Sequence, residues 1–125
     1  MQDTKRAVLC VDDNKDNLDL MTFVFEDAGF DVTACDSLDE CLHYARSKTL
    51  DAIVLDNRFG ERSSLETCEE IRAFNPRIPI VFYSGETRQF EIDKALKMCG
   101  NAYLLKPNDF DKLTGTVTKL INETQ

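Results

Sequence analysis

Residues 7–13 read Ala-Val-Leu-Cys-Val-Asp-Asp, an apolar run that ends on two aspartates. A short, continuously apolar run of this kind is typical of a strand that is buried on both faces. Three further apolar runs, rich in β-branched or aromatic residues, occupy residues 52–55, 78–83 and 102–105. Each run ends on a group that could hold a metal ion or a phosphoryl group. These groups are Asp12 with Asp13, Asp56, Ser84, and Lys106 with Pro107.

Segments of helical length separate these runs. Residues 15–28 carry apolar side chains at helical spacing, and Gly29 can supply the left-handed residue that ends a helix. Residues 30–35 alternate as a further strand, and residues 37–48 begin with a capping-box pattern that starts a second helix. The remaining helices are predicted over residues 65–74, over residues 87–99 and from Leu113 through Ile121.

The chain thus alternates strands and helices, which favours a parallel sheet covered by helices on both faces. In such a sheet the carboxyl ends of the strands open on one edge, where ligands bind. The polar groups at the strand ends are therefore expected to meet. Taken singly, an acid pair often caps a helix, a serine often starts a turn and Lys-Pro often marks a boundary, so the prediction depends on all of them occurring together.

In this order and at these strand ends, the residues resemble the pattern of two-component response-regulator receiver domains, over essentially the whole chain. The matching residues are Asp12 and Asp13 after the first strand, Asp56 ending the third, Ser84 after the fourth, Tyr103 in the fifth and Lys106-Pro107 just after it. The resemblance implies an α/β, flavodoxin-like, doubly wound fold with a five-stranded parallel sheet (order 2-1-3-4-5) and five helices. It also implies a single, chemotaxis-regulator-like receiver over residues 1–125 without an output domain.

Composition agrees with a small module of this kind. The chain has 15 basic and 23 acidic residues, a formal net charge of −8, which argues against nucleic acid or an anionic membrane as a direct partner. No apolar stretch is long enough to span a bilayer and no signal-peptide pattern is present, so a cytoplasmic protein is expected. The five cysteines are scattered without a CxxC pair and are expected to be free, buried thiols, with redox sensing as the alternative.

The chemistry follows from what phosphoryl transfer to a carboxylate requires, which is a cation that neutralises charge. Asp12, Asp13 and Asp56 offer the hard oxygen ligands that suit Mg²⁺, with Mn²⁺ also possible. The resemblance implies that the Arg58 backbone carbonyl completes this set and that Asp56 is the phosphoacceptor. It further implies that Lys106 and Ser84 bind the phosphoryl oxygens and that the peptide before Pro107 is cis.

Signalling requires a second state. The resemblance makes Tyr103 the switch residue, turning from exposed to buried as Ser84 moves toward the phosphoryl group. This change would reshape the face made by the fourth helix, the fifth strand and the fifth helix, through which the protein would signal or form a weak dimer if it is not a monomer. The alternative is that Tyr103 is only a packed strand aromatic.

Arg58 and Glu86 stand two residues beyond Asp56 and Ser84, and with Gly85 and Pro107 they flank the expected site. We hypothesise that an Arg58–Glu86 ion pair lies across the site and slows hydrolysis of the phosphoryl group. The alternative is an exposed pair of little energetic value.

The expected partners are a histidine kinase or a phosphotransfer protein, and a downstream target protein. The resemblance places kinase docking at the start of the first helix, at Asn14, Lys15, Asn17, Leu18 and Met21. Alternatives are a phosphorylation-independent interaction module and a receiver excised from a hybrid histidine kinase. An enzyme with an external substrate is less favoured, because the expected catalysis is limited to the domain's own phosphorylation and dephosphorylation.

Overall fold

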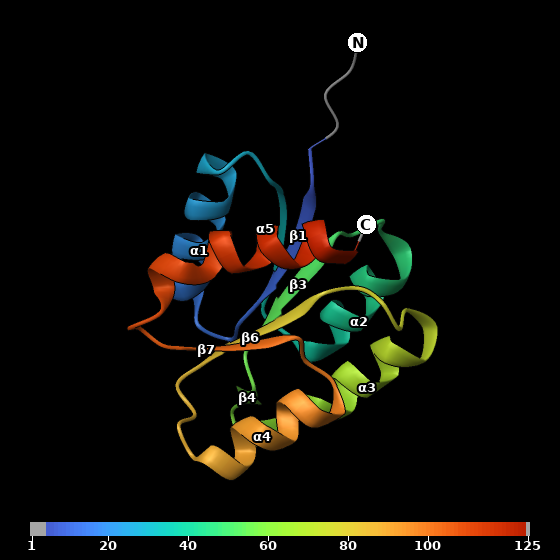
Figure 1. Ribbon diagram of the computed structural model, residues 1–125, viewed down its shortest axis with the longest axis vertical. Coiled ribbons are helices and arrows are strands. Elements are labelled where there is room, and N and C mark those ends of the chain that lie inside the picture. Colours follow the sequence, from blue (N-terminus) through green and yellow to red (C-terminus); the bar gives the residue numbers. More distant parts are fainter. Residues whose placement is uncertain (1–4, 125) are drawn as a thin grey trace.

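The computed structural model describes residues 5–124. Its main sheet has five parallel strands in the order β2-β1-β3-β6-β7 (Figure 1). The strands are β1 (Ala7–Val11), β2 (Asp31–Cys35), β3 (Ala52–Leu55), β6 (Ile80–Ser84) and β7 (Ala102–Leu105). Because β6 and β7 are the fourth and fifth strands of this sheet, the predicted order 2-1-3-4-5 is confirmed.

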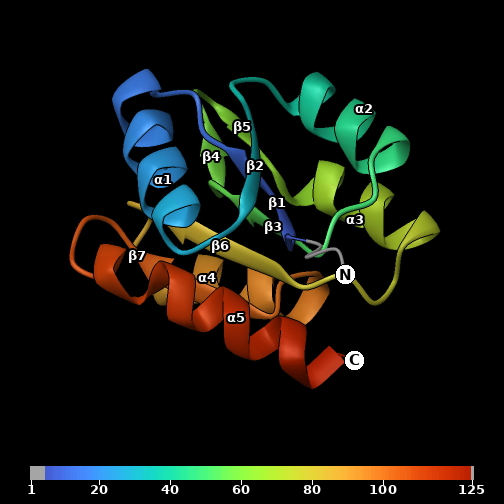
Figure 2. The ribbon, with the colours of Figure 1, turned by 90° about the horizontal axis from the view of Figure 1, so that it is seen from above.

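Five α-helices cover the two faces of the sheet. They are α1 (Lys15–Asp27), α2 (Leu38–Ser47), α3 (Leu65–Phe74), α4 (Gln89–Met98) and α5 (Leu113–Thr124), and a 3₁₀ helix, η1 (Phe110–Lys112), precedes the last. Figures 1 and 2 show α1 and α5 on one face and α2, α3 and α4 on the other. Within residues 5–124, no helix is both long and apolar enough to cross a membrane.

The three central strands, β1, β3 and β6, bury side chains on both faces, as their continuously apolar sequences predict. In β1, Val8 and Cys10 pack with α1 and α5, whereas Leu9 and Val11 pack with α2 and α3. The strands β1, β3, β6 and β7 also place their last residues on one edge of the sheet, because they are parallel and in register. This edge carries the candidate site.

Local sequence signals explain where two helices begin. Asn14 caps α1 by accepting a hydrogen bond from the Asn17 backbone N–H at 2.9 Å. Ser37 does the same for α2, accepting from the Glu40 backbone N–H at 3.1 Å, as the capping-box pattern predicts. Gly29 has a φ of 91°, which confirms its predicted left-handed conformation after α1.

One element was not expected from the sequence. After β3, the strand β4 (Arg58–Phe59) pairs antiparallel with β5 (Arg62–Ser63), and together they form a small hairpin before α3. Gly60, in the turn, has a φ of 61°, a conformation that glycine adopts without the strain of a side chain. The loop that follows Asp56 is therefore ordered into a hairpin.

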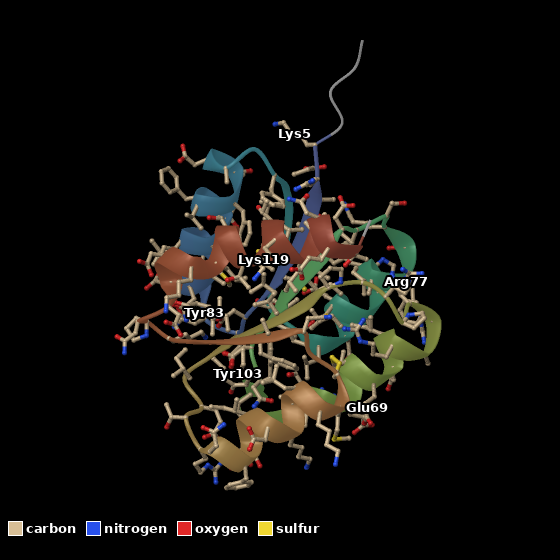
Figure 3. All side chains as sticks on the ribbon, in the orientation of Figure 1. Lys5, Glu69, Arg77, Tyr83, Tyr103 and Lys119 are labelled. Atoms are coloured by element: carbon tan, nitrogen blue, oxygen red, sulfur yellow. A yellow bond between two sulfur atoms is a disulfide. The ribbon has the colours of Figure 1, made fainter. Side chains whose placement is uncertain are left out.

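The prediction that all five cysteines are free thiols is wrong for one pair. Cys68 of α3 and Cys99, directly after α4, form a disulfide, visible as a yellow bond between these helices in Figure 3. Their Cα atoms are 6.1 Å apart, within the range that a disulfide spans. The two cysteines are 31 residues apart and belong to no motif that pairs them, so the sequence alone did not indicate this bond. The other three, Cys10, Cys35 and Cys41, are free and buried as predicted.

Candidate functional site

Three carboxylates converge where β1 and β3 end. Asp12 is 1% exposed and Asp56 is 8% exposed, whereas Asp13 is exposed. One oxygen from each lies within 4.8 Å of the others, so the predicted cluster is confirmed in geometry. Clustered carboxylate oxygens are hard ligands and fit a divalent cation such as Mg²⁺. Backbone N–H groups also reach the cluster, from Asn14 to Asp12 at 2.9 Å and from Arg58 to Asp56 at 3.2 Å.

Lys106, which follows β7, lies between the two buried carboxylates. Its Nζ atom is 2.6 Å from Asp12 Oδ2 and 2.8 Å from Asp56 Oδ2. The Lys106–Pro107 peptide bond is cis, as predicted. A residue far along the chain is thus brought to the same strand edge as the aspartates, as a parallel sheet requires.

The charges of this cluster influence one another. Burial raises the pKa of Asp12 above its usual value, although hydrogen bonds from Lys106 and from the Asn14 backbone act in the opposite direction. Burial would lower the pKa of Lys106, but its hydrogen bonds to Asp12 and Asp56 outweigh this, so the pKa of Lys106 is raised. The ammonium group therefore stays charged and compensates the carboxylates.

Ser84 and Tyr103 lie beside this cluster. Ser84 ends β6, is 1% exposed, and accepts a hydrogen bond from the Glu86 backbone N–H at 3.2 Å. Tyr103 is half-buried, with its ring stacked on Phe82 at 5.8 Å between centroids. Its hydroxyl donates to the Glu86 carbonyl oxygen at 3.2 Å. The half-buried ring is therefore turned inward, which is closer to the orientation that we expected after phosphorylation than to an exposed ring.

The hypothesis of an Arg58–Glu86 ion pair is wrong for this structure. Glu86 instead pairs with Arg88 at 2.6 Å, and Arg58 donates to the Glu61 carbonyl oxygen at 3.3 Å. Arg58 belongs to the hairpin of β4 and β5, and its side chain bonds within that hairpin. Arg88 is only two residues from Glu86 and reaches it without crossing the site. The neighbours Gly85 and Pro107 are both exposed.

The predicted docking residues divide into two groups. Asn14 and Lys15 are exposed and Asn17 is half-buried, so these three are accessible at the start of α1. Leu18 and Met21, at 9% and 1% exposure, are not, because they lie on the face of α1 that packs against the sheet. The exposed apolar residues of this helix are Leu20, at 55%, and Phe23, at 70%.

Sequence reasoning missed Asn57, the residue directly after Asp56. Asn57 is fully buried, and its side-chain Nδ2 donates to the Tyr103 hydroxyl oxygen at 3.2 Å. The available signal was an amide side chain two residues after an apolar, buried strand.

A sequence model of the response regulator receiver domain matches residues 8–118. The chain belongs to this family. The fold and the two-component signalling class implied by the sequence are thereby confirmed.

Among curated relatives, this receiver domain is similar to the transcriptional regulatory protein ZraR of Salmonella typhimurium, with 31% identity over 121 residues. It is also similar to the alkaline phosphatase synthesis transcriptional regulatory protein PhoP of Bacillus subtilis, with 23% identity over 120 residues. These alignments cover 97% and 96% of this chain. The chain spans only about a quarter of ZraR (27%) and half of PhoP (50%).

Solved structures show the same fold. The receiver domain of the Francisella response regulator 1452 superposes with a TM-score of 0.89 at 26% identity, covering 97% of this chain and 100% of that one. A CheY-like receiver domain protein from Methanospirillum hungatei gives a TM-score of 0.90 at 19% identity, covering 97% of both chains.

Proposed function

We propose that Asp56 accepts a phosphoryl group from the phosphohistidine of a histidine kinase or phosphotransfer protein. The observation that carries this proposal is the position of Lys106, whose ammonium group contacts both Asp12 and Asp56 beside Asp13. Three carboxylates and one ammonium group at the end of parallel strands provide an acceptor and compensating charge in one place. Membership of the receiver family supports the same reaction, because receivers are phosphoacceptor switch domains.

In the proposed reaction, a carboxylate oxygen of Asp56 forms a bond to phosphorus while the bond from phosphorus to the donor histidine nitrogen breaks, and the imidazole leaves. Asp12, Asp13, Asp56 and the Arg58 backbone carbonyl would hold Mg²⁺, or Mn²⁺ in its place, and such a cation neutralises the charge of the phosphoryl oxygens. Lys106 would donate hydrogen bonds to these oxygens as a point charge. Ser84, whose oxygen accepts from Glu86, retains its hydroxyl proton as a further donor.

The proposed output is a change at Tyr103 on the face formed by α4, β7 and α5. A bound phosphoryl group adds about −1.5 to −2 units of charge next to Ser84. If Ser84 moves toward it, the Glu86 main chain, which bonds to both Ser84 and Tyr103, moves as well. A downstream protein would bind this face, and a weak dimer would use it; Phe90 of α4 is 62% exposed.

We propose protein partners and not nucleic acid, because the chain carries a net charge of −8. ZraR and PhoP are named transcriptional regulatory proteins, but they are much longer than the stretch that this chain matches. We likewise propose that residues 1–125 act as one receiver unit in the cytoplasm. The donor would dock at the accessible start of α1, around Asn14, Lys15 and Asn17.

Intact-protein mass spectrometry tests the proposal. The protein is exposed to acetyl phosphate with Mg²⁺ and, in parallel, with a chelator, in the wild type and in Asp56→Asn. One phosphoryl adduct that requires both Mg²⁺ and Asp56 is the expected result. If neither acetyl phosphate nor a phosphohistidine donor yields an adduct, the proposal is wrong and a phosphorylation-independent interaction module takes its place.

A further inference from the structure

Asn57, two residues after the end of β3, bonds directly to the hydroxyl of Tyr103. Its Nδ2 atom lies 3.2 Å from the Tyr103 hydroxyl oxygen, and that hydroxyl in turn donates to the Glu86 carbonyl oxygen at 3.2 Å. The tyrosine hydroxyl is therefore held by the Asn57 side chain and by the Glu86 backbone carbonyl, and the Ser84 side chain also interacts with it. Figure 3 shows Tyr103 on the α4 side of β7, the side on which Phe82 stacks against its ring.

The Asn57 side chain carries an energetic cost for the folded state at this position. It is fully buried, and its Oδ1 atom has no hydrogen-bond partner among the described residues. An unpaired buried acceptor destabilises the folded state, and an apolar residue of similar shape would avoid this cost. The adjoining Ser64, whose backbone N–H donates to the Asn57 carbonyl oxygen, is also fully buried with an unpaired hydroxyl. Of these two side chains, Asn57 hydrogen-bonds to Tyr103, whereas the Ser64 hydroxyl has no hydrogen-bond partner among the described residues.

We propose that Asn57 is a positioning residue for Tyr103, helping to hold its ring inward against Phe82 through a hydrogen bond of its own, beside the contact that the Ser84 side chain makes. The residue that follows the phosphoacceptor then determines the fraction of molecules in which Tyr103 is turned inward before phosphorylation. This inference extends the proposed function, because the position of Tyr103 matters for signalling only if Asp56 is phosphorylated. In the unmodified protein, Asn57 favours the inward ring and lowers the amount of rearrangement that phosphorylation must drive.

The test uses ¹⁹F NMR of the whole protein labelled with 3-fluorotyrosine and kept unphosphorylated. The chain has three tyrosines, so three resonances are expected, and Tyr103→Phe identifies the one of interest. Asn57→Leu, with Asn57→Ala as a second variant if the first does not fold, should shift the Tyr103 resonance and leave those of Tyr44 and Tyr83 in place. Ser64→Ala is the matched control, since it removes a neighbouring buried hydroxyl that makes no hydrogen bond to Tyr103.

A second readout separates positioning from general packing. Asn57→Leu is made in the wild type and in Tyr103→Phe, and the unfolding equilibrium constant is measured in urea for all four proteins. The effect of Asn57→Leu on this constant should differ about fivefold between the two backgrounds, as expected for a hydrogen bond worth about 1 kcal/mol. A structural role that does not involve the tyrosine hydroxyl would give the same effect in both.

The inference is overturned if the Tyr103 resonance is unchanged in the Asn57 variants, if Ser64→Ala shifts it equally, or if the effect of Asn57→Leu does not depend on residue 103. None of these measurements requires phosphorylation. Failure of the wild type to form an Asp56 adduct would therefore contradict the proposed function alone, and the two failures remain distinguishable.

Discussion

The Nζ atom of Lys106 lies 2.8 Å from Oδ2 of Asp56, and the same ammonium group also bonds Asp12 at 2.6 Å. The Lys106 side chain is only 17% exposed, so its charge is not freely solvated. Replacing Lys106 with Met keeps most of the apolar stem and leaves two nearly buried carboxylates without their cation. We expect a loss of about 2–4 kcal/mol in the free energy of unfolding, measured by urea denaturation with a chelator present.

Lys112→Met is the control for this measurement. Lys112 pairs with Asp109 at 3.2 Å, but its side chain is 64% exposed, so its removal should change the free energy of unfolding by less than about 1 kcal/mol. Adding Asp12→Asn to Lys106→Met should recover part of the stability, because it removes one of the two unpaired charges. Equal effects of Lys106→Met and Lys112→Met would show that the cluster does not depend on the bridging lysine.

The Glu86–Arg88 pair makes a prediction about pH. Hydrogen bonds from the Arg88 side chain, followed by its backbone N–H, lower the pKa of Glu86 from 4.5 to about 2. A depressed pKa means that the ionised carboxylate favours the folded state, so this stabilisation is present above pH 4.5 and is lost as the pH falls toward about 2. Carboxyl-detected NMR should therefore report a low pKa for Glu86 in the wild type.

Two arginine variants test which residue is responsible. Arg88→Ala should return the pKa of Glu86 toward its ordinary value, whereas Arg58→Ala should leave it unchanged, because Arg58 bonds to the Glu61 carbonyl oxygen instead. The opposite pattern would mean that Glu86 pairs with Arg58, as we hypothesised from the sequence.

The sequence predicted the main features of the site because periodicity and strand ends carry that information. Asp12, Asp56, Ser84 and Lys106 each follow a continuously apolar run, and parallel topology alone brings such positions to one edge. The buried state of Leu18 and Met21 was available from the same periodicity, since both lie on the apolar stripe of α1.

The remaining features depend on side-chain directions that spacing does not encode. Whether Glu86 pairs with Arg58 or with Arg88 is decided by the hairpin after Asp56, which holds Arg58 away. The Asn57–Tyr103 bond joins residues 46 positions apart, and no local pattern announces it. The constraint on Gly100 is also hidden from the sequence, because it comes from a neighbouring aromatic ring and not from a positive φ.

Replacing glycine with alanine should therefore have opposite effects on the free energy of unfolding at Gly100 and at Gly115. A Cβ atom at Gly100 would lie 2.6 Å from two ring atoms of Phe82, which is fully buried, so Gly100→Ala forces the ring to move. We expect it to lower the free energy of unfolding by about 1–3 kcal/mol. Gly115 lies exposed in α5 with nothing within 4 Å of an added Cβ, and Gly115→Ala should raise that free energy by about 0.5–1 kcal/mol.

Urea denaturation of the two variants beside the wild type checks both signs at once. Because Phe82 stacks on Tyr103, Gly100→Ala should also shift the Tyr103 ¹⁹F resonance, and Gly115→Ala should not. If Gly100→Ala left the free energy of unfolding unchanged, the Phe82 ring would have room to move that the packing around it does not suggest.

The cysteines make the last prediction. Burial raises the pKa of Cys10, Cys35 and Cys41 to about 12, so these three thiols stay protonated and should not react with a thiol reagent in the folded protein at pH 8. Protein purified without reductant should then show three reactive thiols after denaturation and five after denaturation with reduction, since Cys68 and Cys99 are joined.

Reduction should also lower stability, because the disulfide closes a loop over a separation of 31 residues and restricts the unfolded chain. The chain-entropy relation gives about 3–4 kcal/mol for a loop of this length. Cys68→Ala should reproduce the loss and abolish its dependence on reductant, whereas the control Cys41→Ala should keep that dependence, because Cys41 is buried but unpaired. Five reactive thiols in denatured, unreduced protein would instead contradict the bond between Cys68 and Cys99.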